Sequence, residues 1–292
     1  MSGAEPMPSV SVVLPAYNEA EIIGSVIASL REVAAGDWQI IVVDDGSADE
    51  TAARAAAEGV TVIRHPYNKG NGAAVKTGLR AATGDIVCLM DADGQHDPRQ
   101  IHALLAELET YDLVIGARQD GGGSGGLLRR LGNGFYNRLA TYLSNQRVVD
   151  LTSGFRAAWR DKMVEFLPLF PNGFSYPTTS TLAFIKAGYN VGFVPIEASR
   201  RVGTSKIRLF SDGTKFVVIA LRMIVLFSPM RVFLPASILM FLAGAGYGAY
   251  TIASRLDVTD ATVLLCTMSV VTFLVGLVSE QIALMRFERL QK

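Results

Sequence analysis

Short apolar runs rich in β-branched residues alternate with amphipathic windows along the first part of the chain. The apolar runs lie at residues 9–14, 39–44, 60–65, 85–90 and 113–117. The windows with helical spacing lie at residues 20–34, 49–58, 70–82 and 98–109. Such alternation is typical of βαβ units and a largely parallel sheet, so we expect an α/β fold. We also expect a helix at 127–144 and a late strand at 190–196.

The pattern changes after residue 206. Residues 207–227 mix large apolar side chains with cations, which is typical of helices that lie in the headgroup plane of a membrane. Residues 232–252 and 261–279 contain no charged side chain, and each stretch approaches the ~20 residues that cross ~30 Å of hydrocarbon. A buried hairpin in a soluble protein is the alternative, which the length of the uncharged stretches disfavours. The sequence therefore predicts an α/β domain at 1–206, interfacial helices at 207–230 and a two-span anchor at 231–292.

Charges outside the two spans predict their orientation. Arg231 precedes the first span and Arg286, Arg289 and Lys292 follow the second, whereas the connection 253–260 carries one arginine and two aspartates. This bias puts the α/β domain and both termini in the cytoplasm. The N-terminus lacks the basic start and apolar core of a signal peptide, in agreement with that orientation. Lys+Arg and Asp+Glu both total 27, so we expect no nucleic-acid partner.

Two carboxylates and an amide follow the apolar run at 85–90. Asp91, Asp93 and Gln95 stand at the carboxyl end of a predicted strand, where open α/β sheets bind ligands. Their oxygens favour Mg²⁺ or Mn²⁺, which usually take one or two protein carboxylates while substrate phosphates fill other positions. The alternative is a turn that only caps the following helix.

Acidic residues also follow the first two strands. Tyr17 and Glu19 come after the first, and Asp45 comes after the second. A tyrosine offers a stacking face, and a carboxylate can accept hydrogen bonds from ribose or a nucleobase. The first strand is not followed by GxGxxG, which argues against a nicotinamide-binding site. Acidic residues at three strand ends of one sheet favour a nucleotide site.

Four motifs, VVLPAYNEAE, VVDDGS, NKGNGAAVKTGL and MDADGQHDP, together resemble family 2 glycosyltransferases of the GT-A fold. The resemblance spans residues 8–206. Within that family, DLTSGFR at 150–156, the basic stretch 200–206 and the two apolar spans are most similar to polyprenyl-phosphate glycosyltransferases. The resemblance implies an enzyme that transfers a sugar from a nucleotide-sugar donor to a polyprenyl phosphate. We expect a UDP- or GDP-linked donor, and we expect inversion because the phosphate dianion can attack the anomeric carbon directly.

The resemblance also implies site residues. The donor nucleotide-sugar is expected at Pro15, Tyr17, Glu19, Asp45, Asp91, Ala92, Asp93, Arg118, Arg200 and Lys206. The metal is expected at Asp93 and Gln95, beside Asp91. The acceptor phosphate is expected at Arg129, Arg130, Ser153, Arg156 and Arg201. Catalysis is expected to depend on Asp93, Arg118 and Asp150, where Asp150 orients the acceptor or acts as a base and the first role is favoured. Each arginine has a surface ion pair as its alternative role.

Other features limit the choice of function. The helix at 127–144 keeps Asn137 but reads LGNGFYN where many relatives have a serine-containing run, and the absence of QxxRW predicts a single transfer. Two alternatives stay open: a membrane glycosyltransferase with a glycolipid, saccharide or protein acceptor, and a catalytically silent scaffold, which the intact acidic motif disfavours. Gly244 and Gly248 form a GxxxG spacing, which permits either a homo-oligomer or packing of the two spans within one chain.

Overall fold

The computed structural model describes residues 8–34, 36–118, 127–173, 175–197 and 209–288, with the backbone alone at 127–131, 133 and 209–217. The chain forms two compact units. The first contains Met1–Thr141 and Gln146–Asp212, and the second contains Tyr142–Asn145 and Gly213–Lys292.

The first unit is built from strands, helices and two short 3-10 helices. Its strands are β1 (Val10–Ala16), β2 (Gln39–Asp44), β3 (Thr61–Arg64), β4 (Ile86–Leu89), β5 (Leu113–Arg118), β6 (Arg156–Trp159) and β7 (Val191–Ile196). Its helices are α1 (Ile23–Val33), α2 (Thr51–Ala57), α3 (Asn71–Ala81), η1 (Pro98–Gln100), α4 (Ile101–Glu107), α5 (Leu127–Ser144), α6 (Arg160–Glu165), η2 (Leu167–Leu169) and α7 (Tyr176–Lys186), with the end of α5 in the second unit.

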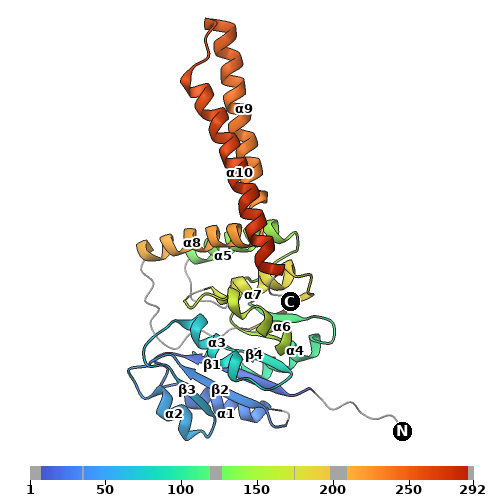
Figure 1. Ribbon diagram of the computed structural model, residues 1–292. Coiled ribbons are helices and arrows are strands. Elements are labelled where there is room, and N and C mark those ends of the chain that lie inside the picture. The colour runs from blue at the N-terminus through green and yellow to red at the C-terminus, as the bar shows by residue number, and fades with distance from the viewer. Residues whose placement is uncertain (1–7, 35, 119–126, 174, 198–208, 289–292) are drawn as a thin grey trace, which may run out of the picture. The chain divides into compact units, whose positions relative to one another are not determined.

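The strands form one sheet in the order β3-β2-β1-β4-β6-β5-β7, of which Figure 1 labels β1, β2, β3 and β4. All neighbours are parallel except β6, which runs antiparallel to both β4 and β5. This confirms the α/β fold. The sequence did not predict β6, because its four residues form a shorter run than a typical strand and begin with an arginine.

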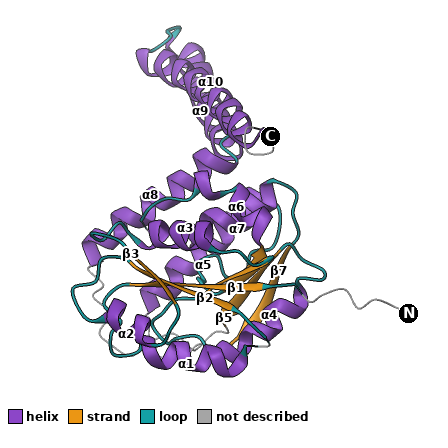
Figure 2. Cartoon of the chain, turned by 60° about the horizontal axis from the view of Figure 1, so that its bottom comes forward, coloured by secondary structure: helices purple, strands orange, loops and turns teal. Residues whose placement is uncertain are grey.

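Helices cover both faces of the sheet (Figure 2). Val12 and Leu14 of β1 pack with α1 on one face in the main hydrophobic core. Val13 points to the other face, where a Cβ atom added to Gly78 of α3 would lie 2.2 Å from its Cγ1 atom. Burial on both faces explains why the parallel strands read as continuous apolar runs.

The second unit contains α8 (Leu209–Phe227), α9 (Met230–Arg255) and α10 (Asp260–Glu288). Both α9 and α10 are long and apolar enough to cross a membrane, and they contain the predicted spans. They lie side by side and antiparallel (Figure 1): a Cβ atom on Gly244 would lie 2.9 Å from the Leu265 Cβ atom, and one on Gly248 would lie 2.6 Å from the Thr262 Cγ2 atom. The GxxxG spacing therefore serves packing within the chain.

Polar contacts fix the start of α9. The Oε2 atom of Glu280, the first charge after the uncharged part of α10, accepts a hydrogen bond from the Met230 N–H at 3.1 Å. A carboxylate at this position satisfies a helix N-terminal donor and complements the helix dipole. The Tyr142 hydroxyl donates to the Arg231 carbonyl oxygen at 2.7 Å, and the Ser228 hydroxyl donates to the Leu143 carbonyl oxygen at 3.0 Å.

Candidate active site

Parallel strands bring the predicted acidic residues to one edge of the sheet. Strand β1 has β2 on one side and β4 on the other, so its carboxyl end is the switch point at which open α/β sheets bind ligands. Tyr17, Asp45 and Asp91 follow β1, β2 and β4, and Arg118 ends β5. Strand β6 begins at this same edge because it runs in the opposite direction, which brings residues 150–155 there.

Asp91 is held between two parts of the chain. The Asn71 side chain, at the start of α3, hydrogen-bonds its carboxylate. On another side, a Cβ atom added to Gly154 would lie 2.6 Å from Asp91 Oδ2, so only glycine leaves room for this carboxylate. Burial raises the pKa of Asp91 to about 6, and repulsion from Asp93 adds to the rise, while Asn71, Arg118 and Arg156 oppose it.

The turn after β4 offers oxygen donors that fit a divalent cation. Asp93 lies close enough to Asp91 to repel its charge, and the Asp93 Oδ1 atom accepts the Gln95 N–H at 3.2 Å. Among the residues that the structure describes, no group of three His, Cys, Asp or Glu side chains could hold a metal ion alone. A cation here would relieve the repulsion between the two carboxylates, so these oxygen donors fit Mg²⁺ or Mn²⁺ whose remaining positions are filled by other ligands. They do not fit a closed protein cage.

His96 lies beside this turn as a neutral ring. Its imidazole stacks on Phe155 with 5.0 Å between ring centroids, and the side chain is buried. Burial lowers the pKa of His96 to about 4, so the ring is uncharged at neutral pH.

Arg118 and Asp150 form a bidentate ion pair. Arg118 Nε donates to Asp150 Oδ2 at 2.8 Å, and Nη2 donates to Asp150 Oδ1 at 3.0 Å and to Thr152 Oγ1 at 2.7 Å. Burial alone would raise the pKa of Asp150, but the hydrogen bonds and charge of Arg118 hold it below its ordinary value. The carboxylate is therefore ionised and is a weak base at neutral pH.

Arg156 lies beneath this site rather than at its surface. Its guanidinium is fully buried, and it donates to the Pro177 carbonyl oxygen at 2.9 Å, the Ser180 hydroxyl at 2.5 Å and the Ser153 carbonyl oxygen. Burial lowers its pKa to about 10, so it stays charged. Arg156 thus connects the backbone at Ser153 to α7. For Arg156 and for Ser153, which is also buried, a contact with the acceptor phosphate stays a prediction.

The residues predicted around the nucleoside differ in accessibility. Pro15 and Ala92 are buried, Glu19 is half-buried and the Tyr17 side chain is 46% exposed. Asp45 is buried, and its carboxylate accepts hydrogen bonds from His65 Nδ1 at 2.7 Å, Lys69 N at 3.0 Å and Gly70 N at 2.8 Å. Asp45 therefore orders the loop between β3 and α3.

Several predicted cations are not described. Arg200, Arg201 and Lys206 lie outside the described residues, and Arg129 and Arg130 lie in the part of α5 where only the backbone is described. The sequence did not single out Asn71, Thr152 or Gly154. All three lie in motifs that carry the family resemblance, NKGNGAAVKTGL for Asn71 and DLTSGFR for Thr152 and Gly154, but their individual roles come from contacts that form across the sheet edge.

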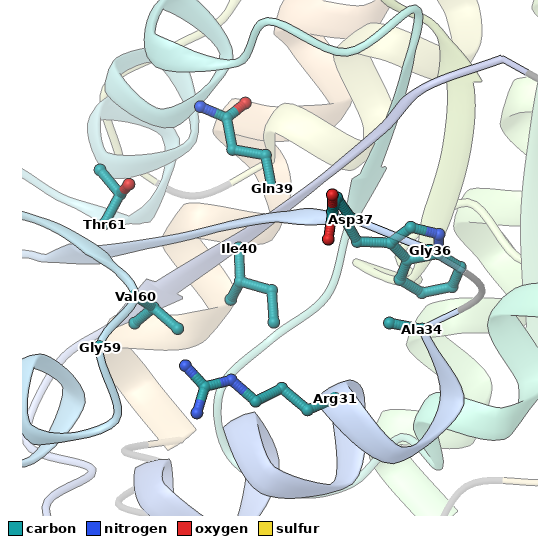
Figure 3. Close-up of a pocket in the computed structure, with 10 residues that line it drawn as sticks. Arg31, Ala34, Gly36, Asp37, Gln39, Ile40, Gly59, Val60 and Thr61 are labelled. Atoms are coloured by element: carbon teal, nitrogen blue, oxygen red, sulfur yellow. The ribbon is translucent and has the colours of Figure 1, made fainter.

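A pocket of about 380 Å³ lies at the opposite edge of the sheet (Figure 3). It is lined by residues at the amino ends of β2 and β3, including Gln39 and Thr61, and by Arg31 of α1. Arg31 already donates to the backbone of Glu58 and lies 3.8 Å from its carboxylate. The acidic strand ends, not this pocket, therefore form the candidate site.

Comparisons with known proteins agree with this geometry. The profile of Glycosyl transferase family 2 matches residues 11–166, more than half of the 292 residues, and the profile of the GtrB C-terminal hairpin matches residues 228–285. Glucosyl-3-phosphoglycerate synthase from Mycobacterium tuberculosis, crystallised with Mn²⁺ and UDP-glucose, has a TM-score of 0.61 and 28% identity, covering 75% of this chain and 78% of that chain.

Curated relatives are similar over most of their length. Dolichyl-phosphate hexose transferase of Haloferax volcanii is 32% identical over 205 residues, which cover 70% of this chain and 88% of the relative. Undecaprenyl-phosphate mannosyltransferase of Micrococcus luteus is 31% identical over 216 residues, covering 68% and 87%. An uncharacterized protein of Methanocaldococcus jannaschii is 38% identical over 154 residues, which cover 50% of this chain and 63% of that relative.

The sheet, its acidic strand ends and these similarities define a glycosyltransferase of the GT-A fold. The chain belongs to glycosyl transferase family 2, and its helices α9 and α10, which match the GtrB C-terminal hairpin, are long and apolar enough to cross a membrane.

Proposed function

We propose that the protein transfers a sugar from a UDP- or GDP-linked donor to a polyprenyl phosphate. One observation carries the proposal: the Asp91–Gln95 turn and the Arg118–Asp150 pair lie at the same sheet edge, which combines a metal-phosphate site with a fixed cation. The relatives named for transfer to dolichyl and undecaprenyl phosphate support a lipid-phosphate acceptor.

The donor diphosphate is assigned to the turn after β4. Asp93 and Gln95 would hold Mg²⁺ or Mn²⁺ beside Asp91, and the Mn²⁺ in the mycobacterial structure supports this choice. Such an ion supplies positive charge to the departing nucleoside diphosphate. Tyr17 offers its exposed ring to the base, while Pro15, Glu19, Asp45 and Ala92 shape the nucleoside end.

The acceptor phosphate serves as the nucleophile. A phosphate monoester has a second pKa near ~6, so it is largely a dianion at neutral pH and needs no strong general base. Its oxygen attacks the anomeric carbon as the bond to the nucleoside diphosphate breaks, which inverts that carbon. Arg118 stabilises the charge of the acceptor phosphate. The role of Asp150 is to orient Arg118 and not to act as a base, because the lowered pKa of its carboxylate makes it a poor base.

The second unit, with α8, α9 and α10, is proposed to bring the lipid acceptor to the catalytic site. Within the described part of α8, the exposed Val218, Leu221 and Val225 lie on the same side as the exposed Arg222, which suits a helix at the headgroup level. The Lys/Arg distribution supports a cytoplasmic catalytic domain and termini. Arg129, Arg130, Arg200, Arg201 and Lys206 are the further cations proposed for donor or acceptor phosphates.

The test is an acceptor assay with the purified full chain. The protein is incubated with radiolabelled UDP- and GDP-sugars and with undecaprenyl phosphate, diacylglycerol or a saccharide in separate reactions. We expect label in a lipid product only with undecaprenyl phosphate. Label in another acceptor would show that this acceptor, and not a polyprenyl phosphate, receives the sugar. If no product formed with any donor or acceptor, the result would support a silent scaffold.

A further inference from the structure

The segment that carries Asp150 is held by two side chains of α5. Asn137 Nδ2 donates to the Val149 carbonyl oxygen at 2.6 Å, and its Oδ1 accepts the Leu151 N–H at 3.0 Å. One helical turn later, Thr141 Oγ1 accepts the Val148 N–H at 3.1 Å. No strand or helix is assigned to residues 148–151, so these side chains supply bonds that a regular element would otherwise make.

The two hydrogen bonds of Asn137 are made to the backbone on either side of Asp150. They use the carbonyl group of Val149 and the N–H group of Leu151, which are the groups that a neighbouring parallel strand would pair. A side-chain amide has the donor and acceptor of a peptide unit, so asparagine can substitute for one here. The position of the Asp150 backbone is therefore fixed from α5.

We propose that Asn137 is a positioning residue for the Arg118–Asp150 pair. Asp150 accepts from Arg118 Nε and Nη2 together, and such a bidentate pair depends on both the distance and the orientation of the carboxylate, which follow the Asp150 backbone. Without Asn137 the carboxylate shifts, and the guanidinium that it orients shifts with it. The expected loss of catalysis rests on the proposed function, in which Arg118 stabilises the acceptor phosphate. The expected loss of order in the backbone at residues 148–151 does not rest on it.

Two substitutions separate this role from a general loss of structure. Asn137→Ala removes both bonds. Asn137→Asp keeps the shape and the acceptor but sets a second oxygen against the Val149 carbonyl oxygen. We expect each to lower kcat about tenfold or more while the donor KM changes less than about twofold, since ~1 Å of misplacement can cost ~100-fold in rate.

Asn145→Asp is the matched control. It makes the same chemical change just after α5, where Asn145 Oδ1 lies 3.5 Å from Arg231 Nη1 and a carboxylate keeps that acceptor. We expect its kcat to equal that of the unsubstituted protein.

A double-mutant cycle and amide exchange complete the test. If Asn137 acts through Arg118, adding Asn137→Ala to Arg118→Lys lowers kcat less than about twofold further, because coupled residues are not additive. Hydrogen exchange at residues 150–153 should become faster in Asn137→Ala and stay unchanged in Asn145→Asp. The inference would be overturned if the losses of kcat from Asn137→Ala and Arg118→Lys multiplied in the double mutant. It would also be overturned if hydrogen exchange at residues 150–153 were unchanged in Asn137→Ala. If no sugar transfer is found with any acceptor, the proposed function fails, while the exchange result still decides whether Asn137 holds this segment.

Discussion

At the scale of single residues, the site depends on how closely backbone and carboxylate approach each other. Asp91 faces the backbone of Gly154 so closely that an added Cβ atom would lie 2.6 Å from its Oδ2 atom. A glycine is needed here because of the space it leaves, not because of its backbone angles. The same residue allows the 150–155 segment to lie beside the Asp91–Gln95 turn.

Gly154→Ala therefore displaces either Asp91 or this segment. We expect kcat to fall about 100-fold, as for ~1 Å of misplacement at a reacting centre. Gly134→Ala in α5 is the control, because a Cβ atom there would have no neighbour within 4 Å. Steady-state kinetics of both variants check the prediction, and full activity in Gly154→Ala would show that Asp91 is not held as described.

Asp150 gives a second prediction at this scale. In Asp150→Asn the charge that holds Arg118 is lost, so we expect weaker acceptor binding and a partial loss of kcat. The acid side of the pH–rate profile should keep its midpoint, because the lowered pKa of Asp150 makes this carboxylate a poor base. Complete loss of turnover with both substrate affinities intact would instead assign Asp150 as the base.

Residues next to predicted strand ends could be found from the sequence, and others could not. Asp91, Asp93 and Asp45 follow strong apolar runs, so strand order alone brings them to one edge. Asn71 and Gly154 matter only because they meet Asp91 in space. The approach of Gly154 to Asp91 depends on the antiparallel direction of β6, which the hydrophobic pattern does not predict.

At the scale of elements, small residues decide how α9 and α10 pack. The sequence predicted two spans, but GxxxG alone could not distinguish pairing between chains from pairing within one. The contacts of Gly244 with Leu265 and Cys266 show that the motif faces α10. Close backbone approach is the usual reason for small residues at such interfaces.

Gly244→Leu should separate the two helices. Its Cβ atom would lie 2.9 Å from the Leu265 Cβ atom, whereas a Cβ atom on Gly246 meets nothing within 4 Å. We expect Gly244→Leu to lower the unfolding temperature in detergent and Gly246→Leu to leave it unchanged, as followed by circular dichroism. Equal effects of the two substitutions would contradict the described packing.

At the scale of the whole molecule, charge predicts the side of the membrane on which the enzyme works. The connection between α9 and α10 contains Leu256, which is 91% exposed, and Asp37 is exposed in the catalytic unit. Cysteines placed singly at these positions, after replacement of Cys88 and Cys266, report the orientation. A membrane-impermeant thiol reagent should label Leu256→Cys in intact cells and Asp37→Cys only after lysis. The reverse pattern would place the catalytic unit outside the cytoplasm.

The proposed reaction is sugar transfer to a lipid phosphate at the acidic sheet edge with the help of a divalent ion. The most direct test measures radiolabelled sugar in an organic-extractable product, with and without undecaprenyl phosphate, for the unsubstituted protein and Asp93→Ala. We expect product that requires the lipid phosphate, disappears with a chelator, returns with Mg²⁺ or Mn²⁺ and is almost absent in Asp93→Ala. Lipid-linked product that forms equally well in Asp93→Ala or in the chelator would contradict this proposal.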